Sequence, residues 1–225
     1  MSWKRIFVGL ACVGLAAPPG VVAMPLLSEV YYDAPGADDG QLFVEISGTP
    51  GASLDGWIVE GINGSNGAAG PTVLLSGVFD ASGLFVVADQ TAEGTTSVVG
   101  AQLLASFDFQ NGPDSIVLRA GDEVLDAIGY GSFGASEVFA GEGQPAPDVS
   151  PGQSLARHFA NVDSDDNAVD FRVLEVPTPG VADFAAVPEP GAALTLGLGL
   201  AGLASVGRAR PLRRRSTASA ELAPR

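Results

Sequence analysis

The chain has 225 residues, of which 46% are hydrophobic, and carries a formal net charge of −15 with 30 Gly and 16 Pro. This apolar content excludes a disordered chain, and the many Gly and Pro residues favour short strands joined by turns over helices. The acidity is concentrated in residues 24–187, which hold 24 acidic residues, three arginines and no lysine, a formal charge of −21 that disfavours binding to nucleic-acid phosphates.

Residues 1–23 have the three parts of a secretory signal peptide: two basic residues near the start, an apolar run over 6–17, and a small-residue Val-Val-Ala ending. The apolar run is too short to span a bilayer. A lipoprotein cleavage box ending at Cys12 is the weaker alternative, because Gly9 stands where a branched aliphatic residue is usual and Cys12 comes early in the run. The sequence therefore predicts secretion across the inner membrane.

From residue 24 onward, β-branched and aromatic runs alternate with turn clusters every ten or so residues, a pattern typical of a β-sandwich. Trp57 is the expected core anchor of the third run. The domain shows no sustained 3.6-residue apolar periodicity, so we expect almost no helix. The predicted strands are 26–32, 41–46, 54–62, 72–75, 84–87, 103–109, 115–118, 124–130 and 152–157.

Several of these runs carry ordered motifs that together resemble the lamin tail domain. They are FVEIS…LDGW, NGPDSIVL…GDEVLDAIGYG, GQSLAR and a closing DF…PTPG. The resemblance covers residues 24–181 and departs from the family at 47–50, where an Asn-Pro-Thr turn is frequent. It implies an all-β, immunoglobulin-like β-sandwich that acts as a non-catalytic module. Residues 182–187 read as a linker.

The C-terminal part reads as an address signal over residues 188–215, followed by a cytoplasmic tail, 216–225. An apolar run over 191–207 has a helical length of about 25 Å and predicts a single transmembrane helix. The basic cluster after it would stay on the cytoplasmic side. The motif before the run is Val187, Pro188, Glu189 and Pro190, and the cluster after it is Arg208, Arg210, Arg213, Arg214 and Arg215.

This order of Pro-Glu-Pro, apolar run and arginines resembles the PEP-CTERM sorting signal. The resemblance implies an exosortase-type processing enzyme as partner, a transient membrane anchor, and delivery to a Gram-negative cell surface or its exopolysaccharide matrix. Extracellular polysaccharide or surface proteins are the expected ligands, and nucleic acid is not. Two alternatives remain open: a permanently membrane-anchored envelope protein, and an extracellular hydrolase acting on polymer.

The residues themselves offer little catalytic chemistry. His158 is the sole histidine and has no G-x-S-x-G motif to accompany it, so we expect an exposed or structural role and no enzyme activity. Carboxylate pairs for glycoside hydrolysis are numerous, but aromatic residues for a sugar cleft are few. Glu29 and Glu45 lie on consecutive predicted strands, and we expect Glu45 to form an ion pair with Arg157.

One loop suggests a cation. Asp163, Asp165, Asn167 and Asp170 present oxygen atoms at the spacing that opens a Ca²⁺ loop, although Ala168 and Leu174 occupy positions where an EF-hand needs Gly and Glu. In the alternative interpretation, these side chains stabilise turns by accepting hydrogen bonds from their own backbone. Both interpretations stay open at the level of the sequence.

Overall fold

The computed structural model describes residues 24–186, and this part of the chain is nearly all β. The predicted signal peptide, the sorting motif Val187–Pro190 and the arginine cluster lie outside the described residues. The strands are β1 Leu26–Tyr31, β2 Phe43–Ser47, β3 Trp57–Asn63, β4 Ala69–Leu74, β5 Leu84–Asp89, β6 Leu103–Ala105, β7 Asp114–Ala120, β8 Glu123–Tyr130, β9 Ser154–Arg157 and β10 Phe171–Leu174; the helix is α1, Asn167–Asp170.

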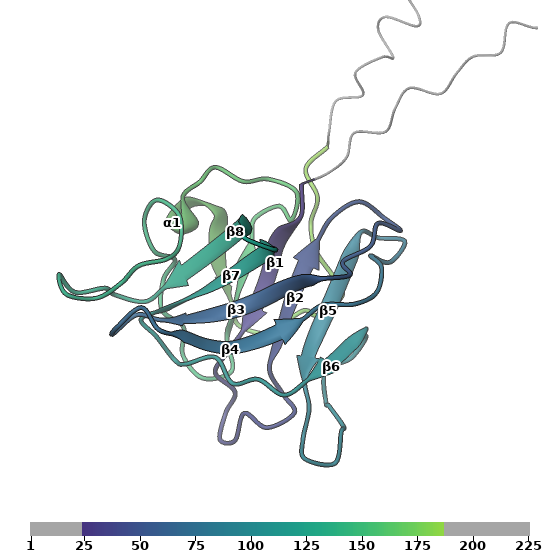
Figure 1. Cartoon of the computed structure of the whole chain (residues 1–225), viewed down its shortest axis with the longest axis horizontal. Coiled ribbons are helices and arrows are strands. Elements are labelled where there is room, and N and C mark those ends of the chain that lie inside the picture. Colours follow the sequence, from purple (N-terminus) through teal and green to yellow (C-terminus); the bar gives the residue numbers. More distant parts are fainter. Residues whose placement is uncertain (1–23, 187–225) are drawn as a thin grey trace, which may run out of the picture. The chain divides into compact units, whose positions relative to one another are not determined.

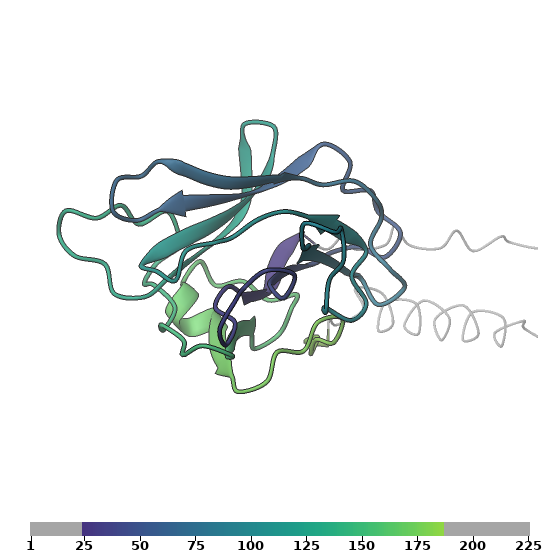
Figure 2. The same cartoon turned by 90° about the horizontal axis from the view of Figure 1, so that it is seen from below.

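The strands form two sheets that lie as layers over one another (Figures 1 and 2). One sheet has six strands in the order β10-β9-β1-β2-β5-β6, and the other has four in the order β4-β3-β7-β8. Every neighbouring pair is antiparallel except β5 and β6. Two sheets with almost no helix is the arrangement of a β-sandwich, as the spacing of turns along the chain predicts.

The hydrophobic core lies between the two sheets. Val30 and Val44 are paired across β1 and β2, and they belong to the same buried cluster as Ile116 and Ile128 of β7 and β8. All of the apolar residues of this cluster lie between Leu27 and Phe171, so residues 24–186 contain a core of their own.

Each predicted strand overlaps an observed one, while β10 was not predicted as a strand. Its four residues directly follow α1 and complete the sheet only by pairing with β9, Phe171 against Arg157. Trp57 is half-buried and packs edge-on against Phe79 with ring centroids 6.3 Å apart. The largest fully buried side chains are instead Tyr32 and Tyr130, whose rings stack at 4.0 Å.

The two ends of the described chain leave the domain at the same end (Figure 1). The Ser47 hydroxyl bonds the carbonyl oxygens of Leu26, at the start of β1, and of Ala160. The Ala160 amide in turn donates to the Asp183 carbonyl oxygen at 2.7 Å. The first strand and the last described residues therefore meet at one point of the sheet.

Candidate functional site

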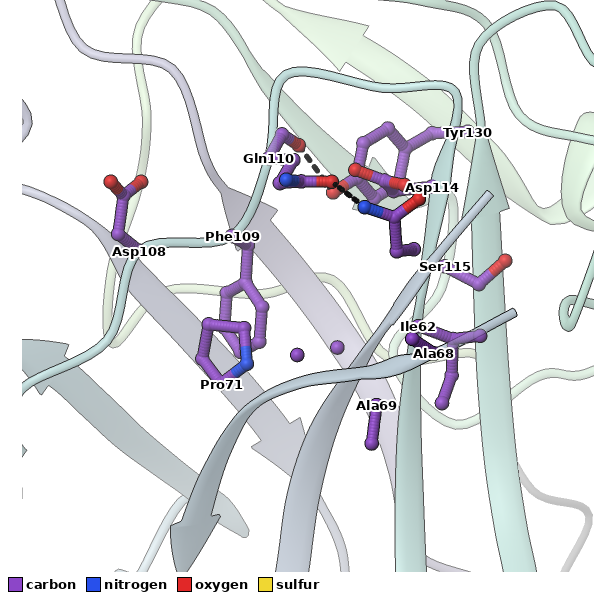
Figure 3. A pocket seen from close by; sticks show the side chains of 13 residues that line it. Ile62, Ala68, Ala69, Pro71, Asp108, Phe109, Gln110, Asp114, Ser115 and Tyr130 are labelled. Carbon is purple, nitrogen blue, oxygen red and sulfur yellow. Dashed lines mark hydrogen bonds between the residues drawn. The ribbon is translucent and has the colours of Figure 1, made fainter. Parts of the chain in front are cut away.

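A polar pocket opens where β4 separates from β3 (Figure 3). The register pairs Glu60 with Thr72 and then Ile62 with Ala69, so two residues of β4 lie opposite the single residue Gly61. Such a bulge bends the strand and interrupts the ladder of hydrogen bonds. The second of the two is a proline, Pro71, which has no N–H to contribute. The space beside the bulge has a volume of about 270 Å³.

The floor of the pocket is aromatic and its rim is polar. Phe109 and Tyr130 are buried at 2% and 0% exposure, while Asp108 and Gln110 are exposed. The Tyr130 hydroxyl donates to the Gln110 carbonyl oxygen at 2.8 Å, and Asn63 Nδ2 donates to Gln110 Oε1 at 2.7 Å (Figure 3). These two bonds fix Gln110, and among the described residues none accepts a hydrogen bond from its Nε2.

The pocket is also electronegative. Asp114 Oδ1 accepts the Gly64 amide at 2.5 Å, yet burial is the larger effect and raises the pKa of Asp114 above its ordinary value, with Glu137 adding repulsion. Burial raises the pKa of Asp108 as well, and Asp38 adds to it. The residues lining the pocket include no Lys, Arg or His. The lining therefore offers hydrogen-bond acceptors and negative charge, with no cationic group.

Nothing in this lining is arranged for nucleophilic catalysis. Its serine, Ser115, accepts a hydrogen bond from the Ala140 amide at 3.1 Å, and the lining holds no basic side chain beside it. His158, the candidate base, is exposed, and its backbone amide, just after β9, donates to the carbonyl oxygen of Asp170 at the end of α1. The lining therefore contains no serine–histidine pair of the kind that acyl transfer uses.

A second cluster surrounds Arg157, which is 3% exposed at the end of β9. Its Nη2 donates to both oxygens of Asp126 at 2.7 and 2.9 Å. Its Nη1 lies 3.0 Å from Asp170 Oδ2 and 3.2 Å from Asp163 Oδ1, and its Nε donates to the Leu27 carbonyl oxygen at 2.9 Å. The guanidinium thereby joins β1, β8, β9 and the loop before α1. Arg157 therefore has a structural role.

This network corrects the expected ion pair between Arg157 and Glu45. Arg157 pairs with aspartates, whereas Glu45 accepts hydrogen bonds from the Ser28 hydroxyl and the Gly180 amide, both at 2.7 Å. The sequence pointed to the wrong partner because neither Asp126, 31 residues from Arg157, nor Glu45 is a local neighbour of Arg157 along the chain. Only the pairing of the sheets brings the two together.

The four residues of the suggested Ca²⁺ loop are all engaged with the protein. Asp163 and Asp170 contact Arg157, and Asp170 also accepts bonds from the Ser164 amide and hydroxyl. Asp163 Oδ1 accepts the amide of Asp165, which has a positive φ of 55°.

Asn167 is fully buried: its Oδ1 accepts the amides of Gly129 and Glu142, and its Nδ2 donates to the Ala127 carbonyl oxygen. Next to it, Asp166 caps α1 by accepting the Ala168 amide. Asp163 and Asp170 thus accept bonds from the backbone of their own loop, whereas Asn167 bonds distant backbone groups and Asp165 contributes its backbone amide.

The structure adds two acids that the sequence gave no reason to choose. Ligand oxygens of Asp126, Glu142 and Asp163 lie within 4.8 Å of one another. Glu142 Oε2 is buried without a hydrogen-bond partner among the described residues, and burial, with Asp126 nearby, raises its pKa to about 8. The raised pKa favours the uncharged form of Glu142 and so limits the negative charge beside Arg157. No sequence motif links these residues.

A third feature is the C-terminal segment, residues 175–186, which lies along the six-stranded sheet. The Thr178 amide and hydroxyl donate to the two oxygens of Glu29 at 2.9 and 2.7 Å, and the Gly180 amide donates to Glu45. Further along, Asn161 exchanges two hydrogen bonds with the backbone of Ala185. The chain is thus held to the domain until one residue before its described end.

Glu29 and Glu45 are direct cross-strand partners on β1 and β2, as their places on consecutive strands suggested. They are 1% and 0% exposed, and neither forms an ion pair with a described residue. Burial raises the pKa of Glu45 to about 7, against the opposing effect of its bonds to Ser28 and Gly180. The buried carboxyl group of Glu45 thus has hydroxyl and amide donors as its hydrogen-bond partners and no cationic partner among the described residues.

Comparisons of the chain with protein-family models, with curated proteins and with solved structures gave no match. Within residues 24–186, no helix is both long and apolar enough to cross a membrane. The function therefore has to be inferred from the chemistry of the sequence and of the sites described above.

Proposed function

We propose that the chain is an exported, non-catalytic binding or structural module of the bacterial cell surface or exopolysaccharide matrix, sorted by an exosortase-type system. Its domain would be a lamin-tail-like, immunoglobulin-like β-sandwich. The observation that carries the proposal is the order of features in the sequence: a signal peptide over 1–23, a β domain, then Val187–Pro190, an apolar run and an arginine cluster.

Two features of the domain support this proposal. The start of β1 and the segment before Ala186 lie at one end, so a domain held by its C-terminal tail would direct its other end away from the membrane. The described residues also include a ligand-sized pocket with no nucleophile–base pair. Both suit a tethered or released binding module better than an enzyme.

The proposal is tested by following the two ends of the protein in cells of a host that carries an exosortase-type enzyme. We expect the mature protein to begin near Met24, to lack the arginine cluster, and to be recovered from the medium or the extracellular matrix, as intact mass and cell fractionation would show. Replacing Pro188, Glu189 and Pro190 by alanine would keep it in the membrane.

The matched control replaces Pro177 and Pro179, which precede the sorting motif, and should leave release unchanged. A wild-type chain that stays in the membrane with its arginines attached would favour the permanent anchor instead. Turnover of extracellular polymer by the released protein, lost on replacing an acidic pair, would favour the hydrolase.

A further inference from the structure

We propose that the pocket beside the bulge of β4 binds one amino-sugar unit, with a protonated amino group, of an extracellular polysaccharide. That the ligand is an extracellular polysaccharide rests on the proposed function. That its sugar carries an amino group rests on the pocket itself. It concerns the cavity between the β3–β4 hairpin and residues 108–115.

The size and walls of the pocket suit one sugar ring. Its volume of about 270 Å³ lies just below the range of roughly 300–1,000 Å³ for ligand pockets, so it excludes larger cofactors. One wall is the backbone of Ala68, Ala69 and Gly70, which has no bulky side chains, and the floor is formed by Phe109 and Tyr130. The wall of small residues leaves room for one pyranose ring, and the buried rings of Phe109 and Tyr130 close the floor beneath it.

Polar groups at the rim supply directional contacts. The Gln110 amide is held by Asn63 through Oε1, which leaves its Nε2 to donate to a ligand hydroxyl. Asp114 uses Oδ1 for the Gly64 amide, and its second oxygen has no partner among the described residues. Asp108 accepts no hydrogen bond from the described residues. Figure 3 shows Asp108 and Asp114 on either side of Gln110.

The charge of the pocket selects among sugars. Two carboxylates lie in the lining and no cationic side chain accompanies them. The three arginines of the domain are engaged elsewhere: Arg119 with Glu60, Arg172 with Asp183, and Arg157 with its aspartates. Uronic or sulfated sugars would therefore be repelled, and an ammonium group would gain charge-assisted hydrogen bonds. Burial raises the pKa values of both aspartates, and so does repulsion from acids outside the pocket, Asp38 and Asp89 for Asp108 and Glu137 for Asp114.

The test measures binding by calorimetry, using the full chain purified in a polyoxyethylene detergent, which contains no sugar. The probes are glucosamine oligomers, N-acetylglucosamine oligomers, galacturonate oligomers and spermidine. We expect glucosamine oligomers to bind about tenfold more tightly than their acetylated counterparts, and galacturonate oligomers not to bind. Purified protein makes the result independent of sorting, so a chain that binds but is not released would contradict only the proposed function.

Three variants locate the site. Ala69→Phe fills the pocket without changing charge, Asp108→Asn removes one exposed carboxylate at the rim, and each should weaken glucosamine binding about tenfold. Asp122→Asn, at the exposed turn between β7 and β8, makes the same charge change as a control and should have no effect.

Any of three results would overturn the inference. One is absence of glucosamine binding. Another is binding that spermidine reproduces and that Ala69→Phe leaves intact, which would show diffuse attraction to the acidic domain. The third is equal affinity for acetylated oligomers, which would contradict the role assigned to the amino group.

Discussion

Two buried groups of charged side chains join the six-stranded sheet to distant parts of the chain. One group contains a cation and the other does not. At the end of β9, the guanidinium of Arg157 compensates the carboxylates that it binds. On β1 and β2, Glu29 and Glu45 hold the C-terminal segment through hydroxyl and amide donors, with no ion pair.

This difference decides how each group responds to change. Removing the cation from the first group leaves several buried carboxylates unpaired, so its cost is large and nearly independent of pH around neutrality. The second group has no cation to lose, and its response comes through the titration of Glu45. The predictions below separate these two behaviours.

The largest effect is expected for Arg157→Met, which should lower the free energy of unfolding by about 3–5 kcal/mol because it strands buried carboxylates. Urea denaturation measures this loss. Arg172→Met is the matched control, because its pair with Asp183 is 42% and 68% exposed and should be worth at most about 1 kcal/mol. Equal costs for the two variants would contradict the structural role of Arg157.

Asn167→Ala should cost about 2–3 kcal/mol, because three backbone groups of Ala127, Gly129 and Glu142 lose their buried partner. This loss would show that the loop beside Arg157 is held by hydrogen bonds as well as by charge. Asn66→Ala removes a single bond on an exposed turn and should change stability by about 0.5 kcal/mol or less. Chemical denaturation of both variants at neutral pH compares them directly.

The pH dependence around pH 7 should come mainly from Glu45 of the second group, and Glu142 beside Arg157 should add to it near pH 8. The folded pKa of Glu45, about 7, lies above its ordinary value of 4.5, so its contribution to stability is fully present below pH 4.5 and is lost as pH rises through 7. Unfolding free energies at pH 6 and pH 8.5 should therefore differ less in Glu45→Gln than in the wild type, by on the order of 2 kcal/mol.

Glu142 titrates in the same direction near pH 8, so Glu142→Gln is the comparison variant, and the double variant should remove most of the remaining slope. An unchanged pH profile in Glu45→Gln would show that Glu45 titrates normally in the folded protein.

Thr178→Val tests the C-terminal segment and should cost about 1 kcal/mol, because it deletes the hydroxyl that donates to Glu29 at 2.7 Å. The loss should be local, so hydrogen exchange should accelerate over 175–186 and stay unchanged in the core strands. Thr72→Val on exposed β4 is the control. Uniform acceleration across the domain would mean that the segment is part of the cooperative core.

The smallest effect is expected from divalent cations. Since Asp163 and Asp170 are bound to Arg157 and Asn167 is used by the backbone, Ca²⁺ and Mg²⁺ should raise the melting temperature slightly and equally, by screening the acidic surface. A rise with Ca²⁺ alone that Asp163→Ala abolishes would instead establish a specific site by linkage and would restore the calcium interpretation.

The sequence by itself determined the β class, the places of the strands and the near absence of helix, because apolar alternation and turn residues act over a few neighbouring positions. The runs at 26–32, 84–87 and 124–130 all became strands at nearly those bounds. It also placed Glu29 and Glu45 on consecutive strands, where they pair.

Only the tertiary structure decided which polar groups meet. Arg157 finds Asp126, and Glu45 finds Gly180, 135 residues away, because strand order and register bring them together. The pocket exists for the same reason, since the bulge of β4 opposite Gly61 opens it against Phe109 of the loop before β7 and Tyr130 of β8. Patterns over a few neighbouring residues encode the strands. The partner of a buried charged side chain depends on which distant strands pair, and a local pattern does not contain that information.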